Sequence, residues 1–209
     1  MKITIVIGSP KFKESNSEII VNSLCPMISD NDIEIININR NSISEKQFER
    51  IFVSGALIFA FPLYADSIPS HLLRFLADLE LKGFHNKDIM VYTIVNNGFF
   101  EGCQNHIAIA QMKNWCNAVQ LKWGQGIGIG SGEMQPAIRN VPAGHGPNKS
   151  IGNALKSLAD HINNCKSGKD ILVSPNFPRF LWKKAGNIFW YQQAKENGLR
   201  RKDLYIKIH

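Results

Sequence analysis

Short apolar runs alternate along the chain with longer stretches in which apolar residues recur three and four positions apart. The short runs predict five β-strands, at residues 2–7, 33–38, 53–61, 88–95 and 120–129. The longer stretches predict four helices, at residues 16–28, 69–82, 103–119 and 150–165. In the first run nearly every residue is apolar, which is typical of a strand buried on both faces. The order favours an α/β fold: a three-layer sandwich with a five-stranded parallel sheet between helices.

The chain has 209 residues, 44% of them hydrophobic and 20% charged, as expected for one large globular domain. We divide it into a domain at residues 1–168 and a basic, aromatic C-terminal extension at 169–209, packed on the body. No apolar run is long enough to span a bilayer, and the apolar start at residues 3–7 is too short for a signal peptide. We therefore expect a cytoplasmic protein.

The four cysteines, Cys25, Cys103, Cys116 and Cys165, contain no C-x-x-C pair, so we expect no metal site. The net charge of +7 is concentrated in the extension, where nine Lys or Arg stand against three Asp or Glu, a net +6. The first 168 residues carry only +1. Since a nucleic-acid-binding protein more often spreads cations over its recognition surface, we expect no nucleic-acid partner.

A helix at about 177–194 combines aromatic residues with Lys183 and Lys184. This pattern permits an interfacial helix on an anionic membrane, or docking on the body or on a second subunit. We favour docking, because the apolar face has no long uncharged run, and keep membrane contact as the alternative.

The loop after the first strand is rich in groups that bind anions. Gly8 permits a tight turn, and the helix that follows presents unpaired N–H groups and the positive end of its dipole. Hydroxyl, amide and ammonium groups come from Ser9, Lys11, Lys13, Ser15, Asn16 and Ser17. A capping box of Ser15 with Glu18 would explain those two residues but not the whole cluster. The loop therefore predicts a phosphate cradle, without a G-x-G-x-x-G fingerprint or a Walker A motif.

Two further loops follow strands that end at the same edge of the predicted sheet. Pro62-Leu63-Tyr64-Ala65 follows the third strand, where Tyr64 offers a flat aromatic face; a plain strand-to-helix connector is the alternative. Asn97-Gly98-Phe99 follows the fourth strand, where Gly98 permits close approach of a ligand, although Asn-Gly also forms ordinary turns. Ligands of open parallel sheets bind beyond these carboxyl ends.

These three motifs, in this order, resemble the flavodoxin-like NAD(P)H-dependent FMN reductases over about residues 1–165. The resemblance implies a flavodoxin-like sandwich in which Ser9, Lys11, Ser15, Asn16 and Ser17 hold the FMN phosphate. It also implies that the isoalloxazine lies against Pro62, Leu63, Tyr64, Ala65, Asn97, Gly98 and Phe99. The chain departs from the family where a phosphate-loop Arg is replaced by Lys11 or Lys13, which lack bidentate geometry.

The function implied is an oxidoreductase that takes hydride from NADH or NADPH and passes electrons from FMN to a quinone, flavin or similar small molecule. No dedicated catalytic residue is required, because the cofactor carries the chemistry. The family also implies a homodimer. The alternatives are a flavodoxin-type electron carrier without direct NAD(P)H turnover, and a basic-tailed adaptor. The long loop after the fifth strand favours the enzyme as a lid, with Glu133 and His145 either near the site or in solvent.

Overall fold

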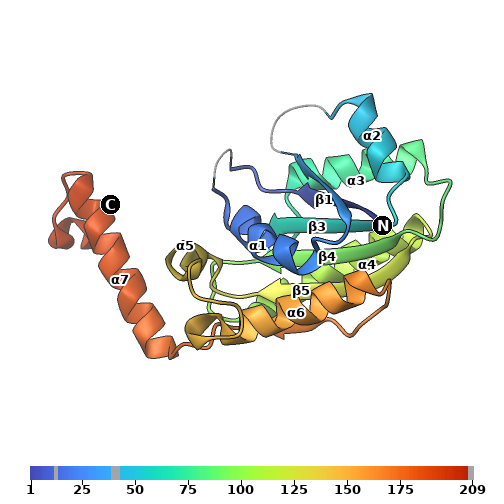
Figure 1. Ribbon diagram of the computed structural model, residues 1–209. Coiled ribbons are helices and arrows are strands. Elements are labelled where there is room, and N and C mark those ends of the chain that lie inside the picture. Colours follow the sequence, from blue (N-terminus) through green and yellow to red (C-terminus); the bar gives the residue numbers. More distant parts are fainter. Residues whose placement is uncertain (12–13, 39–42, 207–209) are drawn as a thin grey trace. The chain divides into compact units, whose positions relative to one another are not determined.

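The computed structural model describes residues 1–11, 14–38 and 43–206, which form two compact units, Met1–Asn176 and Phe177–His209. The first unit is built on a parallel sheet with helices on both faces (Figure 1). The strands are β1 Lys2–Ile7, β2 Asp32–Asn37, β3 Ala56–Pro62, β4 Met90–Asn96, β5 Lys122–Ile129 and β6 Ile171–Val173. The helices of this unit are α1 Asn16–Leu24, α2 Glu45–Phe52, α3 Ser70–Lys82, α4 His106–Ala118, α5 Gln135–Ile138 and α6 Lys149–Asn163.

The strand order is β2-β1-β3-β4-β5-β6, and every pairing is parallel. The prediction of five strands was wrong by one. Residues 171–173, which lie within the predicted C-terminal extension, pair with Ile127–Ile129 of β5 as a sixth strand at the edge. Asp170 fixes this register, because its Oδ1 accepts hydrogen bonds from the Gly126 N–H at 2.7 Å and from Trp123 Nε1 at 3.1 Å.

Helix α2 was not predicted from the spacing of apolar residues. Its start is marked by a capping box, in which the Ser44 hydroxyl accepts from the Gln47 N–H and the Gln47 side chain accepts from the Ser44 N–H. Phe48 and Ile51 of this helix are buried against the sheet. A helix of eight residues with two core side chains gives only a weak periodic signal.

Two apolar cores cover the two faces of the sheet. In β3, Leu57, Phe59 and Phe61 pack toward α2, α3 and α4, whereas Ala56, Ile58 and Ala60 pack toward α1 and α6. This alternation follows from the two-residue period of a strand. All strand residues from Ala56 to Phe61 are fully buried, as expected for a central parallel strand.

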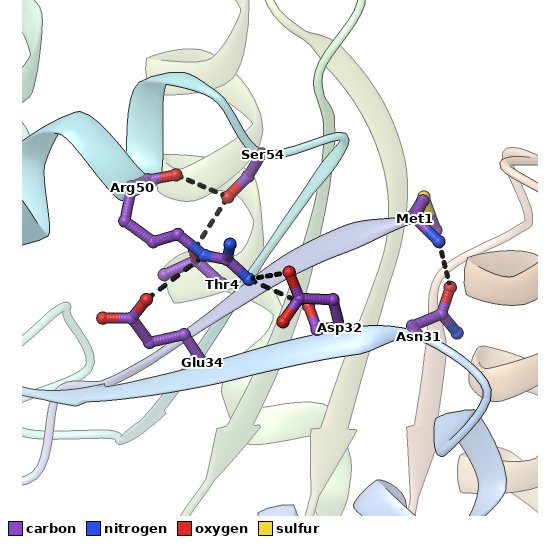
Figure 2. A network of polar contacts seen from close by, with 7 residues as sticks. All are labelled: Met1, Thr4, Asn31, Asp32, Glu34, Arg50 and Ser54. Carbon is purple, nitrogen blue, oxygen red and sulfur yellow. Dashed lines mark hydrogen bonds and ion pairs between the residues drawn. The ribbon is translucent and has the colours of Figure 1, made fainter.

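A polar network surrounds the N-terminal halves of β1 and β2 (Figure 2). Arg50 of α2 forms ion pairs with Asp32 at 3.0 Å and Glu34 at 3.2 Å. Ser54 donates to the Arg50 carbonyl at 2.9 Å, so the buried Thr4 hydroxyl is the donor in its 2.7 Å contact with Ser54. The network therefore ties α2 to β1 and β2.

The second unit consists of α7 (Arg179–Glu196) and a 3₁₀ turn at Arg201–Tyr205. After α7, Gly198 has a φ of 74°, and the Leu199 N–H returns to the Ala194 carbonyl at 2.8 Å. The chain then folds back so that the Tyr205 and Tyr191 hydroxyls lie 3.0 Å apart, with Arg201 4.5 Å from the Tyr191 ring centroid. No helix in the described part of the chain is both long and apolar enough to cross a membrane.

Candidate functional site

The carboxyl ends of β1, β3, β4 and β5 are joined by backbone hydrogen bonds beyond the last paired residues. The Gly8 N–H donates to the Ala60 carbonyl at 2.8 Å, and the Leu63 N–H donates to the Asn96 carbonyl at 2.7 Å. The strand order reverses between β1 and β3, which is the switch point where open parallel sheets bind ligands. The structure therefore brings the three predicted loops to one edge.

The first loop packs tightly on α3. A Cβ on Gly8 would lie 2.7 Å from Leu72 Cδ2 and 3.2 Å from Phe61 Cβ, so any larger residue would require the Leu72 side chain to shift. Ser9 is buried, and its hydroxyl receives a long contact of 3.4 Å from the Lys11 N–H. The Lys11 side chain is exposed, and Lys13 lies outside the described residues.

Helix α1 begins at this loop with Ser15 as its N-cap. The Ser15 hydroxyl oxygen accepts from the Glu18 N–H at 3.1 Å, which is one of the two hydrogen bonds of the capping box suggested as an alternative. Its hydrogen remains available to a ligand. The N–H groups of Asn16 and Ser17, in the first turn, have no helical carbonyl to bond. The geometry thus combines a cap with donors suited to an anion.

Ser17 has a different side-chain role from the one predicted. Its buried hydroxyl donates to Asn96 Oδ1 at 2.7 Å, so the hydroxyl hydrogen is directed to the end of β4 rather than into the loop. Ser17 can serve an anion through its backbone N–H. Asn96 was not among the predicted site residues, because nothing in its local sequence marks a partner 79 positions away.

The loop after β3 forms a tight reverse turn. Tyr64 and Ser67 exchange both backbone hydrogen bonds, at 3.1 and 3.0 Å, around Ala65 and Asp66. Both central residues are left-handed, with φ of 46° and 57°, as in a type I′ turn. Gln111 of α4 holds the turn by accepting from Ser67 Oγ at 3.1 Å. Tyr64 is 50% exposed at the tip, while Pro62 and Leu63 are half-buried.

The loop after β4 is fastened to the loop after β5. The Gly132 N–H donates to the Asn97 carbonyl at 2.6 Å, and the Ser131 N–H donates to the Phe99 carbonyl at 2.5 Å. Among the described residues, the buried Asn97 Oδ1 and Ser131 Oγ have no hydrogen-bond partner. Phe99 is 56% exposed. An open space lies beside Gly98, where a Cβ would meet only the Glu133 carboxyl group, at 3.6 Å.

The long loop after β5 contributes two groups near this edge. Glu133 lies beside Gly98, as one of the two alternatives proposed, whereas His145 is exposed. Arg139, which the sequence did not single out, lies 3.9 Å from Glu14 across an open groove of about 400 Å³ between α1 and the end of α5. The structure thus brings a guanidinium close to the first loop from a distant segment.

His71 is a second residue that the sequence analysis missed. It lies in the first turn of α3 beside the Gly8 backbone. Its buried Nε2 has no hydrogen-bond partner among the described residues. Burial lowers the pKa of His71, and the Gly8 backbone offsets part of that effect. The lowered pKa favours the neutral imidazole, so His71 packs beside the first loop without adding a fixed charge.

The described residues contain no group of three or more His, Cys, Asp or Glu that could hold a metal ion. What the edge offers is a set of hydroxyl and backbone N–H donors at one end and two exposed aromatic rings, Tyr64 and Phe99, at the ends of neighbouring strands. Such an arrangement suits a ligand with an anionic end and a planar ring.

No protein-family model matches the chain, and neither does any curated protein. Solved structures do match its fold. An NADH:FMN oxidoreductase in its apo form aligns with a TM-score of 0.61 and 14% identity, over 79% of this chain and 90% of that one. An FMN-dependent NADH-azoreductase from Bacillus anthracis, in complex with FMN, aligns with a TM-score of 0.57 and 14% identity, over 78% and 100%.

A short-chain flavodoxin associated with a bacterial microcompartment aligns with a TM-score of 0.54 and 12% identity, over 80% of this chain and all of that one. The structural neighbours thus include both NAD(P)H-dependent oxidoreductases and flavodoxins. At these identities the likeness establishes architecture, and the strand order β2-β1-β3-β4-β5 agrees with it. The first unit of this chain therefore has the flavodoxin-like fold, extended by one parallel edge strand.

Proposed function

We propose that the protein is an FMN-dependent oxidoreductase that takes hydride from NADH or NADPH and passes the electrons to a quinone, a flavin or a similar small molecule. The observation that carries the proposal is the convergence of the three predicted loops at the β1/β3 switch point, with anion donors beside two exposed aromatic rings. The neighbouring solved structures named for FMN and NADH chemistry support it.

The phosphate of FMN would be held by the first loop and the start of α1. Ser15 offers its hydroxyl hydrogen, and Asn16 and Ser17 offer backbone N–H groups. Ser9 and Lys11 complete the set, with the exposed Lys11 ammonium free to turn toward an anion. Arg139 brings a guanidinium within 3.9 Å of Glu14 of the same loop, which itself contains lysines and no arginine.

The ring of FMN would lie against the second and third loops. Tyr64 and Phe99 provide apolar faces, and Leu63 and the open side of Gly98 allow close approach. Pro62, Ala65 and Asn97 shape the backbone around these groups, and the free Asn97 Oδ1 offers an acceptor for a ring N–H. The unpartnered Asn97 acceptor and the two exposed rings support this assignment.

Bound FMN would supply the redox chemistry, by accepting hydride and releasing electrons to the acceptor. The protein would bind, orient and shield the ring. The backbone bonds from Ser131 and Gly132 to Phe99 and Asn97 hold the loops after β4 and β5 together, so that this wall of the site is rigid. No side chain is required as a dedicated acid, base or nucleophile.

The alternative is a flavodoxin-type electron carrier, favoured by the equally long match to a flavodoxin. Both functions need the same FMN site, and direct reduction by NAD(P)H separates them. We further propose that the protein acts as a cytoplasmic homodimer.

The FMN assignment is tested by titrating the apoprotein with FMN and recording the visible spectrum. Wild-type protein should bind FMN stoichiometrically, and Tyr64→Ala should shift the flavin bands because the ring loses an aromatic neighbour. Leu81→Ala, at an 86% exposed position of α3 outside the site, is the matched control and should leave the bands unchanged. Identical spectra for Tyr64→Ala and wild type would exclude Tyr64 from the ring site.

A further inference from the structure

The C-terminal unit differs in charge from the rest of the chain. Residues 177–209 contain eight Lys or Arg and two Asp or Glu, a net +6 in 33 positions. Residues 1–176, more than five times as many, carry +1. The proposed redox chemistry needs none of this charge, so the unit requires its own explanation.

The same unit exposes large apolar side chains. Ala194 is the buried residue of α7, while Phe180 is 72% exposed and Trp190 is 58% exposed. Further exposed apolar residues of the unit are Leu181, Ile188, Phe189, Leu199, Leu204 and Ile206. Exposed apolar surface on this scale marks a site of interaction.

The arrangement along α7 separates part of its apolar residues from part of its cations. Ile188 and Phe189 follow Leu181 by seven and eight positions, so these three residues share one side of this 18-residue helix. Lys183 lies on the opposite side of the helix, and Lys184, three positions after Leu181 and four before Ile188, lies at the edge of the apolar side. The long aliphatic chains of these lysines can extend, so that the ammonium groups reach anionic groups while the apolar side of the helix is buried in an apolar environment.

We infer that the C-terminal unit docks on an anionic lipid surface, with α7 lying in the plane of the headgroups. Aromatic and aliphatic side chains would enter the headgroup boundary, and the Lys and Arg side chains would pair with lipid phosphates. Since no described helix can cross a bilayer, the contact would be peripheral.

Charge and exposed apolar residues together favour an anionic membrane over a second copy of the chain and over a nucleic acid. A second copy would bring another +6 against the first, which disfavours self-association through this unit. A nucleic acid would account for the cations but not for Leu181, Ile188 and Phe189. An anionic membrane accounts for both. We therefore take the membrane contact, which the sequence left as the alternative to docking, as the inference for this unit.

The inference is tested by co-sedimentation of the full-length protein with lipid vesicles. One set contains phosphatidylcholine alone, and the other contains equal parts of phosphatidylcholine and phosphatidylglycerol. We expect binding to the anionic vesicles that weakens as salt is raised, and little binding to the neutral ones.

Two variants separate the contributions. Lys183→Gln/Lys184→Gln should lower the partition coefficient at least about tenfold through lost charge. Phe189→Gln/Trp190→Gln should lower it comparably through lost apolar contact. The matched controls are Lys46→Gln/Lys166→Gln and Leu81→Gln, at exposed positions of the first unit, which should bind like wild type. Circular dichroism shows whether each variant keeps its helix content.

Failure of wild-type protein to sediment with anionic vesicles would overturn the inference. So would equal binding to both vesicle types, or controls as impaired as the α7 variants. Salt-sensitive binding to duplex DNA without vesicle binding would assign the unit to a nucleic acid. Loss of a dimer in Phe189→Gln/Trp190→Gln with unchanged vesicle binding would assign α7 to a second copy. None of these results depends on FMN.

Discussion

The Ser17 hydroxyl donates to Asn96 Oδ1 at 2.7 Å and thereby joins the first turn of α1 to the last residue of β4. Both side chains are buried. The bond links the segment proposed to hold a phosphate to the strand whose loop is proposed to face the ring. This contact between residues far apart in sequence therefore connects the two halves of the site, in addition to the backbone bonds between the strand ends.

Ser17→Ala should lower the free energy of unfolding by about 1–3 kcal/mol, because Asn96 Oδ1 would be left buried without its donor. Asn96→Ala should cost a similar amount, and the double variant should cost less than the sum of the two, since the same bond is lost in each. Urea denaturation of the three variants and wild type measures these values. Strictly additive losses would show that the two side chains do not interact.

Ser15→Ala should destabilise the protein and weaken FMN binding together. The lost N-cap costs about 1 kcal/mol, and the lost hydroxyl donor should weaken FMN binding about tenfold. Ser44→Ala is the matched control, because it removes the equivalent cap of α2 outside the predicted site residues. It should lower stability similarly and leave FMN affinity unchanged, as measured by fluorescence titration. Equal FMN affinities in the two variants would contradict the phosphate assignment.

Gly102→Ala should detach the sixth strand. A Cβ at this position would overlap the Val173 carbonyl oxygen and backbone nitrogen in β6, which cannot give way as a flexible side chain can. We expect a loss of about 1–3 kcal/mol in unfolding free energy and faster amide exchange at Ile171–Val173. Gly186→Ala in α7 is the control, since a Cβ there meets nothing within 4 Å. Slow exchange at Ile171–Val173 in Gly102→Ala would argue against the β6 pairing.

His71 should make stability depend on pH. Because burial lowers its pKa in the folded state, the unfolded chain binds the proton more readily. The stabilising contribution is complete above the unfolded pKa of about 6.5 and is lost as the pH falls through the folded value. The melting temperature of wild type should therefore fall more between about pH 7.5 and about pH 5.5 than that of His71→Asn. Equal decreases would mean that His71 is not held neutral by burial.

Thiol labelling checks the packing of α4 on the sheet. Cys116 is fully buried, and burial raises its pKa to about 12, so it should resist labelling in the native protein. Cys103 and Cys165 are exposed and should react readily. Mass spectrometry of the labelled peptides distinguishes the positions. Rapid native labelling of Cys116 would mean that α4 does not pack as described.

The five longer strands could be predicted from sequence because each is a short, nearly continuous apolar run. Helices α1, α3, α4 and α6 could be predicted because their apolar residues recur three and four positions apart. Residues 171–173 could not be predicted, because three residues at a sheet edge are too few to show a pattern. Their pairing with β5 depends on the hydrogen bond of Asp170 to Gly126 and on the glycines of β5. Helix α2 could have been found from the Ser44-x-x-Gln47 capping box.

The candidate site divides in the same way. The loops with Ser9, Tyr64 and Gly98 were recognisable because each directly follows a strand that ends at one edge. The partnership of Ser17 with Asn96, the approach of Arg139 to Glu14 and the place of His71 beside Gly8 depend on tertiary packing between distant segments. No local pattern encodes such contacts.

The most direct test of the account is to load the protein with FMN, remove free flavin and add NADH or NADPH under anaerobic conditions. The proposed oxidoreductase should retain the flavin spectrum after desalting. The flavin absorbance should then bleach within the time needed to mix the protein with NADH, with NADPH or with either. Retained flavin that stays oxidised with both nucleotides would contradict the enzyme and favour the electron carrier. Failure to retain FMN at all would contradict the assignment of the site.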